Sequence, residues 1–195
     1  GRNLTISGEL DAATGDFSGD VDIDGTLETD AITLGGASFI KVAGTNFTTS
    51  LIVGHSTTGT LSSASDDTAV GVGAMDALTS GVDNTAVGTN ALGALTTGQY
   101  NTAMGAESLQ ALISGGANTA YGRFAGRLVT GDFNTLIGRS SGAIIAAGDY
   151  NVTLGKDAGD NITSGSGNII IGTGDAAAAD SARTFKVISY DGSST

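Results

Sequence analysis

The sequence contains no cysteine, no proline and no tryptophan, and its one histidine is His55. Without cysteine the chain has no disulfide scaffold, no thiolate metal site and no cysteine nucleophile. A single histidine excludes a site built on a histidine pair and leaves little for a serine–histidine triad. Glycine reaches 32 of 195 residues but does not recur at every third position, so a collagen-like chain is also excluded.

Positive charge is scarce as well. The chain carries 8 basic residues against 20 acidic ones, which gives a net charge of −12. This balance argues against nucleic acid or an anionic membrane as a partner, because phosphate groups would be repelled. No run of 18 apolar residues predicts a membrane-spanning helix, so we expect no membrane insertion. The sequence starts with Gly1 and shows no secretory signal pattern, so we expect a processed product or a piece of a longer protein.

Repetition is the main feature that the sequence does have. A five-residue unit, Asn-Thr-Ala-apolar-Gly, first appears at residue 67 with Asp in the first place and recurs at spacings of 17, 17, 17, 16, 17 and 17. The other copies start with an asparagine, at Asn84, Asn101, Asn118, Asn134, Asn151 and Asn168. Each copy ends in a glycine, at Gly71, Gly88, Gly105, Gly122, Gly138, Gly155 and Gly172. A fixed period of this kind predicts stacked structural repeats.

Each place in the unit predicts a structural role. Thr-Ala-Val favours extended backbone, so every copy is predicted to begin with a short strand. The large apolar residue in the fourth place, such as Val70 or Met104, is expected to point into a core. The next glycine permits a corner with positive φ, and the asparagines are expected to stack as an amide ladder. A second glycine closes each unit, three residues after an apolar residue, which places the single deletion before Leu128.

The second half of the unit is ambiguous between strand and helix. Leu92 and Leu95 are spaced for one helical turn, but short apolar runs do not distinguish the two. A 17-residue unit is short for a strand–helix coil and fits a flattened coil with two short faces. The expected fold is therefore all-β, with short helical turns as an open alternative: a repetitive parallel β-roll or β-solenoid of about seven coils. Such a roll is thin, so we expect it to associate with other chains.

Composition divides the chain into four segments. Residues 1–36 contain short alternating strands that end at glycine, and residues 37–66 form a transition rich in Gly, Ser and Thr. Residues 67–174 hold the seven repeats. Residues 175–195 hold a last predicted strand at 184–188 and a tail.

The Asn-Thr-Ala-Val-Gly units resemble repeats of tail-fibre and adhesin proteins of marine bacteriophages, over residues 67–172. They are more distantly similar to the heads of trimeric autotransporter adhesins, which form a left-handed parallel β-roll. The stretch Gly-Asp-Val-Asp-Ile-Asp-Gly at 19–25, with Ile-Thr-Leu-Gly-Gly at 32–36, resembles phage fibre shafts. The resemblance implies a homotrimer in a virion tail fibre outside the cell. It also implies contact with other fibre or virion proteins and with a host-surface glycan or protein.

A basic column is the first candidate receptor contact. Arg123, Arg139 and Lys156 follow the strand glycine in three successive units, and Arg127 lies nearby. Guanidinium groups suit carboxylate or phosphate recognition, as on anionic glycans. The alternative is that these side chains pair with acidic residues of neighbouring coils, at Asp132, Asp149 or Asp157.

An aromatic column is the second candidate. Tyr100, Phe133 and Tyr150 each precede the asparagine of a unit. Exposed rings there would stack on sugar rings. Corner packing or contact between the chains of a trimer is the alternative.

Two weak metal candidates lie before the repeats. Asp20, Asp22 and Asp24 match the first half of a calcium loop, but Ala31 stands where the loop needs a bidentate glutamate. Acidic residues at alternate positions on the solvent-exposed face of a strand would give the same pattern without a metal. His55 is either a hydrogen-bonded structural residue or, with three copies on a trimer axis, a metal or anion ligand.

No catalytic constellation stands out, so we expect no enzyme and no cofactor. A bacterial surface adhesin or self-assembling extracellular filament is the main alternative function. An ice-binding solenoid would need an exposed threonine grid, and the threonine column that begins at Thr68 ends where Val152 takes its place. A polysaccharide depolymerase would need paired carboxylates assembled between chains.

Overall fold

The computed structural model describes residues 32–34, 37–44, 47–53, 63–176 and 178–188. Within these ranges lie twelve strands and no helix. The first strands form an antiparallel lead-in, in which β2 (Ala37–Gly44) pairs with both β1 (Ile32–Leu34) and β3 (Phe47–Val53). A two-residue strand, β4 (Ala64–Ser65), pairs with β3 in parallel.

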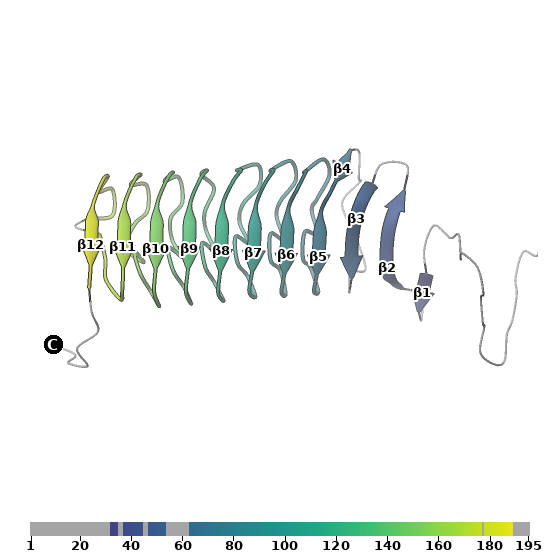
Figure 1. The fold of residues 1–195 in the computed structure, drawn as a ribbon, viewed down its shortest axis with the longest axis horizontal. Coiled ribbons are helices and arrows are strands. Elements are labelled where there is room, and N and C mark those ends of the chain that lie inside the picture. Colours follow the sequence, from purple (N-terminus) through teal and green to yellow (C-terminus); the bar gives the residue numbers. More distant parts are fainter. Residues whose placement is uncertain (1–31, 35–36, 45–46, 54–62, 177, 189–195) are drawn as a thin grey trace, which may run out of the picture.

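Short parallel strands then stack in chain order, one per coil (Figure 1). They are β5 (Thr68–Val70), β6 (Thr85–Val87), β7 (Thr102–Met104), β8 (Thr119–Tyr121), β9 (Thr135–Ile137), β10 (Val152–Leu154), β11 (Ile169–Ile171) and β12 (Phe185–Val187). Equivalent residues pair with one another, as Ala86 does with Ala103. The expected all-β parallel solenoid of about seven turns is confirmed.

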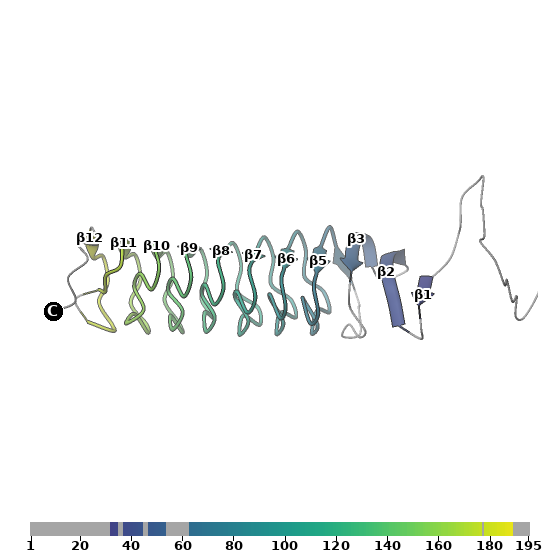
Figure 2. The same ribbon diagram turned by 90° about the horizontal axis from the view of Figure 1, so that it is seen from below.

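The stack also extends at both ends beyond the seven repeats. Strand β3 pairs in parallel with β5, so the apolar run Leu51–Val53 supplies a rung before the first repeat. Strand β12 pairs in parallel with β11 and adds a rung after the last. The strand expected at 184–188 is therefore part of the same sheet. Figure 2 shows the strands along one side of the coils and the connecting turns along the other.

The core lies between the strands and these turns, and it differs from the expectation in one respect. The third residue of each strand unit points inward, as at Ala86 and Ala103, which are fully buried. The fourth residue points outward: Val70 is 37% exposed and Tyr121 is 57% exposed. The prediction that the fourth place faces the core is therefore wrong. Successive side chains of a strand alternate between its faces, so an inward asparagine in the first place sends the fourth residue outward.

Large apolar residues of the second half fill the space opposite these small strand residues. Fully buried members are Met75, Leu78, Leu92, Leu95, Leu109, Leu112, Val129, Ile145 and Ile162. Val129 takes the place expected for Leu128, which is 40% exposed. The deletion in the 16-residue unit therefore lies after Val129, and its predicted position before Leu128 is wrong.

The second half is neither strand nor helix but a series of turns. Asn90 and Leu92 adopt left-handed φ values of 54° and 50°. Glu107, which is equivalent to Asn90 in the next coil, has a φ of 57°. Left-handed residues of this kind do not continue a right-handed helix. The backbone N–H of Leu92 donates instead to the carbonyl of Ser108 in the next coil, at 3.0 Å.

Candidate functional site

The asparagine column forms a continuous buried ladder. Both the backbone N–H and the side-chain amide of Asn118 donate to Oδ1 of Asn101, at 3.0 and 3.1 Å. The Asn118 amide also donates to the carbonyl of Gly131 at 2.9 Å. The same pattern joins every repeat, and Thr184 closes the ladder by donating its N–H to Asn168 Oδ1 at 2.9 Å. The predicted ladder is confirmed, and its role is structural.

Asp67 occupies the first place of this column in the first repeat. Its Oδ1 accepts the backbone N–H and the side-chain amide of Asn84, both at 2.9 Å. Burial raises the pKa of Asp67 to about 6, against a lowering by the hydrogen bonds from Asn84. The carboxylate form is therefore disfavoured at this buried rung.

The strand glycines form the predicted corners. Gly105 has a φ of 140°, and the other members of the column also have positive φ. A Cβ at Gly105 would lie 2.5 Å from the carbonyl carbon and oxygen of Gly122. Glycine is therefore required both by the backbone conformation and by the close stacking of coils.

The aromatic column lies where the chain enters each strand. Tyr100, Phe133 and Tyr150 have φ values of 61°, 59° and 57°, so the backbone is the same at all three. Tyr100 and Tyr150 are each 61% exposed. The rings of Phe133 and Tyr150, one coil apart, stack with centroids 4.8 Å apart and planes 5° apart. The structure thus brings two of the three predicted aromatic residues into contact.

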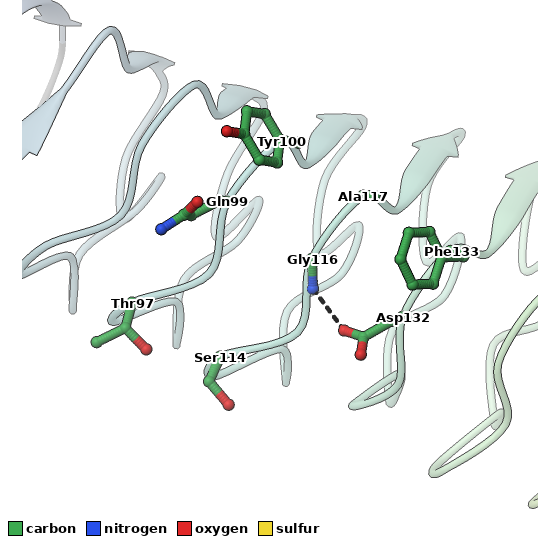
Figure 3. Close-up of a pocket in the computed structure, with 8 residues that line it drawn as sticks. All are labelled: Thr97, Gln99, Tyr100, Ser114, Gly116, Ala117, Asp132 and Phe133. Carbon is green, nitrogen blue, oxygen red and sulfur yellow. Dashed lines mark hydrogen bonds between the residues drawn. The ribbon is translucent and has the colours of Figure 1, made fainter.

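The ring is missing from this column at Ala117, between Tyr100 and Phe133. A pocket of about 420 Å³ opens there, as Figure 3 shows. It is lined by Thr97, Gln99, Tyr100, Ser114, Gly116, Ala117, Asp132 and Phe133. Sequence reasoning named the two aromatic residues but missed the pocket, although Ala117, a small residue between two aromatic members of the column, marks its place.

Asp132 lines this pocket and is held by hydrogen bonds to the backbone. Its Oδ1 accepts the backbone N–H of Gly116 at 2.7 Å (Figure 3). Its own N–H donates to Oδ1 of Asp149 at 2.8 Å, and the N–H of Asp149 donates to Oγ of Ser166 at 3.0 Å. These acidic residues therefore bind the backbone of neighbouring coils.

The basic column makes its contacts within its own coils. The Arg123 guanidinium lies 3.9 Å from the centroid of the Phe124 ring, and that of Arg127 lies 5.4 Å from it. Lys156 forms an ion pair with Asp157 of its own coil. Over the described ranges, Arg123, Arg127 and Arg139 form no ion pair, so pairing with Asp132 or Asp149 of other coils is wrong. Cation–π contact stabilises part of this column instead.

The basic and aromatic columns lie at opposite ends of the strands. Arg123, Arg139 and Lys156 follow strands β8, β9 and β10, whereas Tyr100, Phe133 and Tyr150 precede strands. The predicted contact residues therefore form two separate groups.

The metal candidates Asp20, Asp22, Asp24 and His55 lie outside the described residues. Within the described part of the chain, no group of three or more His, Cys, Asp or Glu side chains could hold a metal ion. Asp160 and Asp175 form a pair of carboxyl groups, in which the hydrogen bond with Asp175, and next the burial of the group, raise the pKa of Asp160 to about 6. Among the same residues, no helix is long and apolar enough to cross a membrane.

The outer face of the sheet carries a series of exposed apolar residues. Its second-place and fourth-place residues point outward, and the exposed apolar ones are Val70, Met104, Tyr121, Ile137, Leu154, Ile169, Phe185 and Val187. With strands about 4.8 Å apart, this face runs for about 34 Å from β5 to β12. No family model, curated protein or solved structure matches the chain. Function is therefore inferred from these surfaces.

Proposed function

We propose that the chain is a non-enzymatic structural segment of a viral tail fibre, assembled as a parallel homotrimer. It acts as a rigid spacer and as a receptor-contacting head on a virion. The observation that supports this proposal is the apolar outer face of the sheet. The resemblance of the repeats to phage fibre proteins supports the viral setting.

Exposure of this face would be unfavourable in a free chain. Monomeric proteins rarely leave contiguous apolar patches larger than a few hundred Å² in contact with water. The fourth-place column runs through Met104, Tyr121 and Ile137 in three successive strands, at 36%, 57% and 37% exposure. Packing this column against the same column of other copies of the chain removes its apolar side chains from water.

Parallel rotational symmetry suits a solenoid of this shape. When copies pack around an axis along the stack, each coil meets the same coil of its neighbours, so all the strands contribute. All chains then run in the same direction, as a spacer between a virion and a host surface requires. Weak receptor contacts repeated on each chain and on several fibres add up to firm attachment.

The test is the mass of the native protein, by light scattering at several concentrations. We expect three times the chain mass of 19.0 kDa. The double variant Met104→Glu, Ile137→Glu introduces charge on the apolar face and is expected to dissociate the assembly. Ile113→Glu is the matched control, because Ile113 is 55% exposed but lies in a turn, away from the strands. A folded native monomer would overturn the proposal.

An ice-binding solenoid is the second candidate, favoured by one observation. The threonines of the column pair with one another in register along the outer face, from Thr68 through Thr119 to Thr135. This candidate needs the same face to be free, so the two functions exclude each other. A monomer with thermal hysteresis would establish it, and a trimer without hysteresis would remove it.

A further inference from the structure

We propose that the pocket between Tyr100 and Phe133 is a carbohydrate site that holds one pyranose ring of a neutral glycan between the two aromatic rings. This inference names a ligand for the receptor contact and, in that sense, rests on the proposed function. The observation that supports it is the pocket, which lies within a single chain.

The pocket lies where a small residue, Ala117, separates two aromatic members of the column. Tyr100, Ala117, Phe133 and Tyr150 occupy equivalent backbone positions in successive coils, with φ values of 61°, 55°, 59° and 57°. Phe133 and Tyr150 show the spacing of a complete step, with centroids 4.8 Å apart. Tyr100 and Phe133 are two steps apart, so their backbone positions are separated by about 9.6 Å along the stack.

A gap of this size admits one ring, as the Phe133 and Tyr150 rings show by stacking at a centroid distance of 4.8 Å. A pyranose chair has axial C–H bonds that project from both faces of its mean plane. Those C–H groups carry partial positive charge and meet the negative faces of the Tyr100 and Phe133 rings.

Polar side chains also line the pocket, with Asp132 next to Phe133 and with Thr97 and Ser114 at the end away from the rings (Figure 3). The side chains of Thr97, Gln99, Ser114 and Asp132 line the pocket together with the two rings (Figure 3). The bond from the Gly116 N–H to Asp132 Oδ1, at 2.7 Å, fixes the carboxylate in place. Two apolar walls with a few oriented polar groups are typical of small-ligand sites, and the volume of about 420 Å³ falls in their range.

The charge around the pocket selects a neutral sugar. None of the eight lining residues is basic, Asp132 is acidic, and the whole chain carries a net charge of −12. A uronic or sialic acid would meet repulsion here without a compensating cation.

The decisive variant is Ala117→Phe, which fills the gap with the missing ring. The same left-handed backbone already carries Tyr100 and Phe133, so the variant is expected to fold. The probes are an array of neutral hexose and N-acetylhexosamine oligosaccharides, then saturation-transfer NMR with the sugars that bind. We expect Ala117→Phe to abolish binding and Tyr100→Ala or Phe133→Ala to weaken it by about tenfold.

Tyr150→Ala is the matched control, because it removes an equally exposed ring on the far side of Phe133. It should retain sugar affinity within about threefold. Native protein that binds no sugar on the array, or Ala117→Phe protein that still binds, would overturn the proposal. Tighter binding of adenosine, used as a flat-ring probe, would overturn the choice of a pyranose.

Mass measurements on the same samples separate this inference from the proposed function. A trimer that binds no sugar refutes the carbohydrate site and leaves the fibre assembly standing. A monomer that binds sugar refutes the assembly and leaves the site standing. Dissociation of the trimer by Tyr100→Ala would identify the aromatic column as a contact between copies and would refute the site.

Discussion

Asn134 donates both its backbone N–H and its side-chain amide to Oδ1 of Asn118, at 2.9 and 3.1 Å. These residues are 16 positions apart, whereas the other ladder steps span 17. The short repeat therefore keeps the ladder and the strand register intact. The missing residue is absorbed in the turn between Val129 and Gly131, and the Gly131 carbonyl still accepts the side-chain amide of Asn118 at 2.9 Å.

The first prediction concerns the ladder. Asn118→Ala removes the acceptor of two Asn134 donors and the donor to the Gly131 carbonyl. Buried polar groups without partners cost about 1–3 kcal/mol each, so we expect a loss of about 3–5 kcal/mol in the free energy of unfolding. Urea denaturation measures it. Gln110→Ala removes a partly exposed side-chain amide in a turn and should stay within about 0.5 kcal/mol of the native protein. Equal effects of the two variants would contradict the structural role of the ladder.

The second prediction concerns the strand corners. Gly105→Ala places a Cβ 2.5 Å from the Gly122 carbonyl in a backbone with a φ of 140°. We expect a loss of at least about 3 kcal/mol, because strain and steric overlap add. Gly93→Ala is the control: its nearest neighbour would be 3.3 Å away, and its φ is not positive. A change within about 1 kcal/mol is expected there in thermal and urea unfolding. Gly105→Ala protein as stable as the control would show that the coils can separate at little cost.

The third prediction concerns pH. The folded-state pKa of Asp67 is raised from 3.8 to about 6, so the folded protein binds this proton more tightly than the unfolded chain. The contribution of Asp67 to stability is therefore fully present below pH 4 and is lost as the pH rises to about 6. The loss amounts to at most about 3 kcal/mol.

Asp67→Asn removes this titration. The difference in unfolding free energy between the variant and the native protein should shift in favour of the variant between pH 4 and pH 7, and then level off. Other carboxyl groups titrate in both proteins, so the difference isolates Asp67. Parallel pH profiles would show that its folded-state pKa is ordinary.

The fourth prediction tests where the deletion lies. Val129 is fully buried and Leu128 is 40% exposed, although sequence alignment alone favours Leu128 as the core residue. Val129→Ala should cost about 2 kcal/mol, and Leu128→Ala less than about 1 kcal/mol. Urea denaturation of the two variants compares them directly. The reverse order would place the deletion before Leu128.

The repeat period was enough to predict the solenoid, the asparagine ladder and the glycine corners. The direction of the strand side chains was also predictable in principle, because successive side chains alternate between the two faces of a strand. Asn101 and Met104 are three positions apart, so they cannot both point inward. The conformation of the turns in the second half of each unit could not be predicted from the sequence. Leucine has no preference for the left-handed backbone that Leu92 adopts, and only contacts between coils impose it.

The candidate contacts were predictable as columns but not as a site. A fixed spacing puts Tyr100 and Phe133 on one edge, yet the pocket depends on how the Ala117 coil lies between them. The surroundings of Arg123 were missed for a related reason. Its neighbour Phe124 adopts a left-handed φ of 64°, and the guanidinium rests on that ring rather than on a carboxylate.

The pairing of equivalent residues in successive coils allows the number of repeats to change during evolution. Each strand pairs residue for residue with the next, as Ala86 does with Ala103 and Ala103 with Ala120. An in-frame duplication or loss of one repeat in the gene would therefore join two coils that already match. The chain would lengthen or shorten by about 4.8 Å per repeat without a new core. The reach of the protein is thus open to selection through recombination between its own copies.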